Sequence, residues 1–200
     1  MLKKVAIKYF VAILAYLAVL YPLWVTLKTI QWTPTASLMF SLFPAFGLLA
    51  FSLLWLHAIS GVFEPWLRKN FDFDKFVNIT ATLILLCLIL HPLLLLVSVG
   101  FNFASIFIYG AGYIWLAIIG WLLLITYDIG KALKKKYAFF VKNWNKILLI
   151  STVGFLLTFF HSLALGHDLQ SGSLRIVWIF YGTTGILATI YTYGIKRFSN

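Results

Sequence analysis

Six long apolar stretches make up most of the chain, and each is about long enough to cross a bilayer. They lie at about residues 8–27, 36–60, 76–99, 104–127, 147–166 and 174–194. A transmembrane helix needs about 20 predominantly apolar residues. Turn-forming residues separate the stretches, namely Pro34, Gly61 to Pro65, Gly100, Gly130 and Gly172. No stretch has the alternating pattern of a membrane β-barrel. The pattern therefore predicts an all-α, polytopic membrane bundle of six helices.

Composition agrees with this prediction and excludes a soluble domain. Hydrophobic residues make up 62% of the chain and charged residues 10%, with a mean hydropathy of +0.98, whereas soluble domains are about one quarter charged. The single cysteine, Cys87, excludes an intramolecular disulfide and a CxxC redox or zinc site. Because the sequence shows no internal repeat and no second domain, we expect one membrane domain over residues 1–200.

Lysine and arginine positions predict the orientation in the membrane. The basic residues that fall on one side, 14 of the 16, are Lys3, Lys4, Lys8, Arg68, Lys69, Lys75, Lys131, Lys134, Lys135, Lys136, Lys142, Lys146, Lys196 and Arg197. Only Lys28 and Arg175 fall on the other side. Cytoplasmic loops carry the basic excess, so we expect both termini in the cytoplasm and the protein in the plasma (cell inner) membrane. The net charge of +11 then needs no nucleic acid to explain it.

The lysine-rich stretch "GKALKKKYAFFVKNWNK" has a second interpretation besides this topology signal. A basic surface of this kind also suits docking of an anionic nucleotide, a flavin or an acidic partner protein. The acidic residues, by contrast, fall in loops or at the ends of the predicted spans: Glu64, Asp72, Asp74, Asp128 and Asp168. Buried carboxylates at mid-membrane usually mark ion or proton paths. Their absence from the predicted span centres disfavours a proton-coupled transporter.

Two histidines interrupt the apolar stretches, His91 in the third and His161 in the fifth. His91 lies sixteen residues beyond Lys75, and His161 lies fifteen beyond Lys146. At 1.5 Å per residue, both are about 22–24 Å along helices that run in the same direction. Two level imidazoles on parallel helices suit the two axial positions of a haem iron. The alternative is that each histidine hydrogen-bonds a neighbouring helix, at under about 2 kcal/mol.

Three further residues, near the ends of the predicted spans, are candidates for contact with a cofactor or with an electron donor or acceptor. His57 lies four residues before Gly61, near the cytoplasmic face, and either caps a neighbouring carbonyl or contacts an inner cofactor or quinone. His167, six residues after His161, is on another helical face, as an outer loop residue or as a contact to the cofactor edge or the acceptor. Arg175 suits a haem propionate, since guanidinium and carboxylate are complementary, and equally a lipid headgroup.

Six spans with both termini inside and histidines in spans three and five resemble the ferric reductase-like transmembrane domain. This superfamily includes ferric reductases, NADPH oxidases, the STEAP metalloreductases and the haem subunit of periplasmic methionine sulfoxide repair. The resemblance covers nearly the whole chain. The segments that carry it are "FDFDKFVNITATLILLCLILHPLLLL", "WNKILLISTVGFLLTFFHSLALG" and, more weakly, "GLLAFSLLWLHAISGVFEPWL".

The resemblance implies haem b, and the residues present imply a single one. In the two-haem members, spans three and five each carry two histidines fourteen positions apart, almost four helical turns, so that two haems stack. Here the positions fourteen before His91 and His161 are Val77 and Ile147, which cannot ligate iron. The resemblance therefore implies one haem b on the outer side, with His91 and His161 as its axial ligands.

In this superfamily electrons pass from NAD(P)H through a cytoplasmic flavin to haem and then to an outer acceptor. The chain has no G-x-G-x-x-G that follows a strand and opens a helix. A separate flavin reductase or a membrane quinol must then supply the electrons, with flavin or quinone docking at the inner ends of the spans, near His57, Arg68 and the lysine-rich stretch. The predicted function is electron transfer of the ferric reductase type, to a ferric chelate, oxygen or a partner protein. The alternative is a cofactor-free multi-pass subunit or assembly partner with structural histidines.

Overall fold

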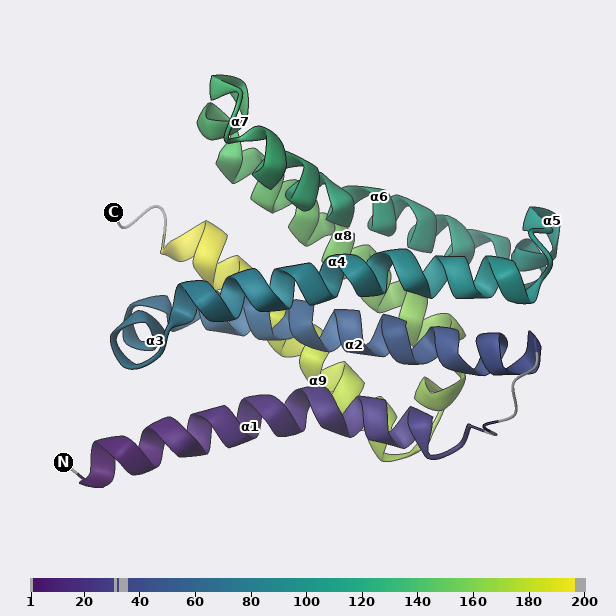
Figure 1. The fold of residues 1–200 in the computed structure, drawn as a ribbon, viewed down its shortest axis with the longest axis horizontal. Helices are drawn as coiled ribbons and strands as arrows, with labels where there is room; N and C mark the ends of the chain where they lie inside the picture. Colours follow the sequence, from purple (N-terminus) through teal and green to yellow (C-terminus); the bar gives the residue numbers. More distant parts are fainter. Residues whose placement is uncertain (1, 31, 33–35, 197–200) are drawn as a thin grey trace. The chain divides into compact units, whose positions relative to one another are not determined.

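Helices make up nearly all of the computed structural model, which describes residues 2–30, 32 and 36–196 (Figure 1). For residues 2–5, 36 and 37 only the backbone is described. The side chains of Lys3 and Lys4 and the residues Pro34 and Arg197, which the predictions use, are therefore outside the described part of the chain. Within those ranges no strand occurs, and six helices are long and apolar enough to cross a membrane. For these residues the prediction of an all-α fold with six helices of membrane-spanning length and hydropathy is confirmed. The chain forms two compact units, Met1–Ser98 and Val99–Asn200.

The first unit contains three long helices and one short one. They are α1 (Leu2–Leu27), α2 (Ala36–Val62), α3 (Glu64–Asn70) and α4 (Phe73–Ser98). Helix α2 packs against both α1 and α4, and α3 lies in the connection between α2 and α4. The buried side chains of α4 include Thr80, Ile84, Cys87 and Leu88, which recur at helical spacing on one face. The alternate face exposes Leu83 and Leu86, as expected of a surface that contacts lipid.

The second unit contains three long helices joined by short helical turns. They are α5 (Phe103–Ile106), η1 (Phe107–Tyr109), α6 (Ala111–Leu133), α7 (Ala138–Lys142), α8 (Trp144–Leu165), η2 (His167–Leu169), α9 (Gly172–Thr189) and the π-helical η3 (Ile190–Ile195). Helix α8 packs along α6 and also contacts α9. Trp178 of α9 is fully buried, and its Nε1 donates to Ser162 Oγ of α8 at 2.8 Å.

Two glycines allow α6 and α8 to approach each other closely. A Cβ atom added at Gly154 would lie 2.7 Å from the carbonyl oxygen of Gly120 and 2.9 Å from the backbone nitrogen of Leu124. A Cβ atom added at Gly120 would lie 3.1 Å from the carbonyl oxygen of Gly154. Small residues are typical of such contacts, because helix association inside a membrane depends on close packing rather than on water exclusion.

The fourth span differs from its prediction. The apolar run from residue 104 is interrupted by the 3₁₀ turn η1 and by Gly110, whose φ of 126° cannot continue a helix. Helix α6 therefore begins at Ala111 and extends to Leu133, instead of ending near residue 127. As a result Asp128, expected at the end of the span, lies inside α6 and more than one turn before its last residue.

Basic side chains gather at one end of each unit. In the first unit, Lys8 Nζ lies 5.3 Å from the ring centroid of Phe71, so the start of α1 and the α2–α4 connection share one end. Lys28 lies after α1, over the ring of Trp24 at 4.6 Å. This separation follows the predicted asymmetry of charge. The cytoplasmic location of both termini and the plasma membrane as the location stay predictions.

Candidate cofactor-binding histidines

His91 lies on the face of α4 that packs against α2, seven residues after the buried Ile84. Its Nδ1 is 2.7 Å from the carbonyl oxygen of Phe43 in α2. The ring rests on Gly47, since a Cβ atom added there would lie 2.8 Å from both Cε1 and Nδ1 of the imidazole. The missing side chain at Gly47 therefore provides the space that the His91 ring fills.

His161 has the same kind of contact in the second unit. Its Nδ1 is 3.1 Å from the carbonyl oxygen of Tyr113 in α6. It lies seven residues after Gly154, on the face of α8 that packs against α6. The neighbouring Ser162 accepts from Trp178 and donates to the carbonyl of Phe159 at 2.8 Å. A polar contact between α8 and α9 therefore lies one residue from His161.

These hydrogen bonds fix the protonation of both rings. A backbone carbonyl can only accept, so Nδ1 carries the proton in His91 and in His161. In a neutral imidazole the lone pair is then on Nε2. Metal-binding histidines commonly donate their other ring N–H to a backbone carbonyl, which fixes the tautomer and the ring orientation. The donor chemistry of both side chains therefore fits axial ligation of haem iron through Nε2.

The two contacts share one sequence spacing. In each unit the histidine follows its carbonyl partner by 48 residues, and the hydrogen bond joins two packed helices. The sequence does not single out Phe43 or Tyr113, because a backbone carbonyl has no signature. Gly47 does leave a signal, as the only glycine within the predicted span 36–60.

His57 of α2 contacts a hydroxyl group of α4. Its Nε2 is 2.6 Å from Thr80 Oγ1, whose own proton is donated to the carbonyl of Phe76 at 2.7 Å. His57 therefore donates from Nε2 to Thr80. Thr80 lies eleven residues before His91, or about 16 Å along α4. His57 and His91 thus lie at separate levels of the same helix pair.

Replacing Thr80 by Val is expected to destabilise the protein by about 1 kcal/mol, because the His57 N–H loses its acceptor inside the membrane helices. The measurement is the free energy of unfolding by SDS titration in detergent. Thr82→Val is the matched control, since the Thr82 hydroxyl bonds only within α4, to Asn78 at 3.0 Å, and is exposed. The double variant Thr80→Val with His57→Ala should lose less free energy of unfolding than the two single variants lose in sum. Equal costs for the Thr80 and Thr82 variants would contradict this role.

His167 and Arg175 lie near the turn that follows α8. The His167 side chain is fully exposed, and its Nδ1 is 3.4 Å from Asp168 Oδ1. Arg175 Nη1 donates to the carbonyl oxygen of Leu169 at 2.8 Å, which holds η2 against the start of α9. A guanidinium has five N–H donors, so this bond uses one of them. Contact of Arg175 with a propionate, and of His167 with a cofactor edge or acceptor, stay predictions.

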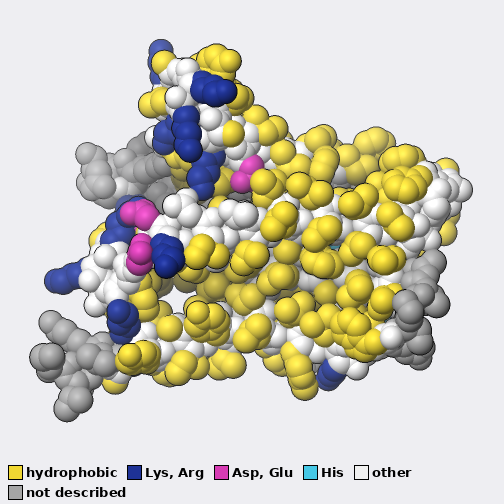
Figure 2. All heavy atoms as spheres, in the orientation of Figure 1, with side chains coloured by type: hydrophobic (Ala, Val, Ile, Leu, Met, Phe, Trp, Pro, Cys, Tyr) yellow, Lys and Arg dark blue, Asp and Glu magenta, His cyan; other side chains and the backbone are white. Residues whose placement is uncertain are grey.

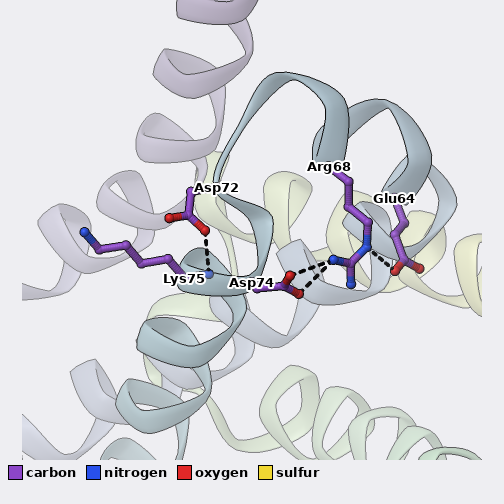
Figure 3. Close-up of polar contacts among 5 residues, drawn as sticks. All are labelled: Glu64, Arg68, Asp72, Asp74 and Lys75. Carbon is purple, nitrogen blue, oxygen red and sulfur yellow. Dashed lines mark hydrogen bonds and ion pairs between the residues drawn. The ribbon is translucent and has the colours of Figure 1, made fainter.

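Arg68 is held within its own connection, as Figure 3 shows. Its Nε is 2.8 Å from Glu64 Oε1, and its Nη1 is 2.8 Å from Asp74 Oδ1. The hydrogen bond with Glu64, followed by that with Asp74, raises the pKa of Arg68 above its ordinary value. Asp72 accepts from the backbone N–H of Lys75 at 3.1 Å. The predicted docking of flavin or quinone near His57 and Arg68 stays a prediction.

Ile147 occupies the position at which two-haem members of the superfamily carry the inner histidine of span five, and here it is a packing residue. Ile147 is buried, and a Cβ atom added at Gly130 would lie 3.0 Å from its Cγ2. This side chain fills the space between α6 and α8 close to their basic end. In the first unit the corresponding residue is Val77, one turn before Thr80. Neither residue has an atom that binds iron.

The fold defines a class, the multi-pass helical membrane proteins, with six candidate spans among the described residues. Comparisons with protein-family models, with curated proteins and with solved structures gave no match. The resemblance to the ferric reductase-like domain therefore stays a prediction.

Proposed function

We propose that the protein is a haem b-containing transmembrane electron-transfer protein of the ferric reductase type, in which Nε2 of His91 and Nε2 of His161 bind one haem iron. The observation that supports this most is the shared bond from Nδ1 to a backbone carbonyl, which puts the lone pair of each ring on Nε2. The similar distances of the two histidines from Lys75 and Lys146 along their helices also support it.

The chain's own residues would orient the haem ligands and keep water away from the haem. The Phe43 and Tyr113 carbonyls hold the two rings, and Gly47 leaves space for one of them. Apolar helices exclude water, and axial ligation with burial sets the reduction potential. Bound haem supplies one-electron chemistry at its iron. Arg175 has further N–H donors that suit a propionate.

The direction of electron flow follows from the predicted topology. We propose that a separate flavin reductase or a membrane quinol delivers electrons on the cytoplasmic side, and that an acceptor outside receives them. Both termini would then be cytoplasmic, and the protein would be an oxidoreductase subunit of the plasma membrane. The chain itself would bind the haem and, at the inner ends of the spans, the flavin or quinone.

The test is the visible spectrum of the purified protein, first oxidised and then reduced with dithionite. A low-spin b-type spectrum is expected from haem-replete cells. A colourless preparation from such cells would favour the alternative, a cofactor-free membrane subunit with structural histidines. One observation favours that alternative, since His57, His91 and His161 all hydrogen-bond a neighbouring helix.

Gly47→Ala is expected to lower the haem affinity by about tenfold or more, as changes in groups that orient a metal ligand do. The added methyl group would lie 2.8 Å from two ring atoms of His91, so the imidazole must move. The measurements are haem content and the reduced spectrum of the purified variant. Gly112→Ala is the control, because a Cβ atom added there meets nothing within 4 Å. Unchanged haem content in Gly47→Ala would contradict this positioning role.

A further inference from the structure

The helix pairs α2–α4 and α6–α8 differ sharply in the charge of their connections. Residues 131–146, from the last turn of α6 to the first turn of α8, carry six lysines and no acidic residue: Lys131, Lys134, Lys135, Lys136, Lys142 and Lys146. Residues 63–75, from the end of α2 to the first turn of α4, carry three basic and three acidic residues: Arg68, Lys69, Lys75, Glu64, Asp72 and Asp74. In that connection Arg68 pairs with two of the carboxylates. One connection is therefore neutral, and the other has a charge of +6.

Five of these six lysines are exposed, whereas Lys131 is half-buried and interacts with Asp128 in the preceding turn of α6. Lys135, Lys136, Lys142 and Lys146 are exposed, and none forms an ion pair within residues 36–196. Lys134 is also exposed, and its Nζ lies 4.4 Å from the ring centroid of Trp144. This stacking joins the end of α6 to the start of α8. A partner with several negative charges would complement the surface.

Exposed apolar side chains lie among these lysines. Tyr137, Phe139 and Val141 have 57%, 67% and 54% of their surface exposed, at alternate positions along the connection. Figure 2 shows lysine and hydrophobic side chains together over α7 and the adjoining end of α6. The ring of Phe140 supports this arrangement, with centroid distances of 5.4 Å to Phe139 and 6.4 Å to Tyr137. A soluble anion would leave the exposed apolar groups in water.

We propose that the connection 131–146 binds anionic phospholipid headgroups, with its lysines on the phosphates and with Phe139 inserted between the lipids. Lys134 directly follows α6, and Trp144 begins α8, so the connection is at the bilayer boundary if these helices span the membrane. Each lysine near an anionic bilayer surface adds about fivefold in affinity. This inference does not depend on haem binding.

The test compares two double variants that remove equal charge. The protein is placed in nanodiscs of mixed phosphatidylglycerol and phosphatidylcholine, and the lipids that remain bound are counted by native mass spectrometry. Lys135→Gln with Lys136→Gln is expected to lower the preference for phosphatidylglycerol by about 25-fold, fivefold for each lysine. Lys69→Gln with Lys75→Gln is expected to leave the preference nearly unchanged, because Glu64, Asp72 and Asp74 make that connection neutral and disfavour anionic headgroups there. Equal losses in both double variants, or no preference in the unmodified protein, would overturn the proposal.

Two further outcomes separate lipid from other partners. Phe139→Ser keeps the charge, and it is expected to weaken the retention of phosphatidylglycerol because an inserted apolar group is lost. Unchanged retention would overturn the insertion of Phe139. ATP is added as a soluble anion to protein in phosphatidylcholine alone. Binding of ATP that depends on Lys135 and Lys136, without enrichment of phosphatidylglycerol, would assign the surface to a soluble partner and overturn the proposal.

Discussion

His91→Ala and His161→Ala are each expected to abolish the low-spin b-type spectrum and to lower the haem content of the purified protein by more than about tenfold. A low-spin iron needs a strong ligand on both faces, and alanine supplies none. Even a change in a group that only orients a metal ligand costs about 10–100-fold in affinity. The measurements are the dithionite-reduced spectrum and the ratio of haem to protein after purification.

His57→Ala and His167→Ala are the matched controls for these variants. His57 lies about 16 Å below His91 along the helix pair and is bonded to Thr80, and His167 has a fully exposed side chain. Both variants should therefore keep the spectrum. If His57→Ala slows reduction of an intact haem, a role at the electron-donor site follows. Loss of the spectrum in His57→Ala, or its survival in His91→Ala or His161→Ala, would contradict the assigned ligands.

Hydropathy alone predicted where the helices lie but not where one of them begins. Five of the six spans agree with the observed helices within about six residues, because a helix that crosses lipid needs a long apolar run. The fourth failed because residues 103–109 are also apolar, yet Gly110 adopts a positive φ and separates them from α6. The run therefore counted residues outside the helix and moved its predicted end to residue 127, short of Asp128.

The histidines were visible in the sequence, but their surroundings were not. A polar residue in an apolar run is conspicuous, and counting from the basic ends gave depths for His91 and His161. The Phe43 and Tyr113 carbonyls became identifiable only when the helices were paired, because every residue has such a group. The shared separation of 48 residues between each histidine and its carbonyl partner was hidden for the same reason.

Gly154→Ala is expected to destabilise the second unit by about 1–3 kcal/mol, the usual cost of an extra methyl group in a close-packed interior. The new Cβ atom would lie 2.7 Å from the Gly120 carbonyl oxygen and 2.9 Å from the Leu124 nitrogen. Both are backbone atoms, so no side chain can rotate away, and α6 and α8 must separate. The measurement is the free energy of unfolding by SDS titration, with Gly112→Ala in α6 as the open-space control.

Gly154→Ala should also affect His161, the candidate haem ligand in the second unit. His161 lies seven residues after Gly154 on the same face of α8, about 10 Å along the helix, and its partner carbonyl at Tyr113 belongs to α6. Separation of the two helices should lengthen that hydrogen bond and release the ring. Gly154→Ala should therefore also lower the haem content, whereas Gly112→Ala should not. A Gly154→Ala protein as stable as the unmodified one would show that α6 and α8 do not pack through Gly120 and Gly154, and the orientation of His161 would then need another cause.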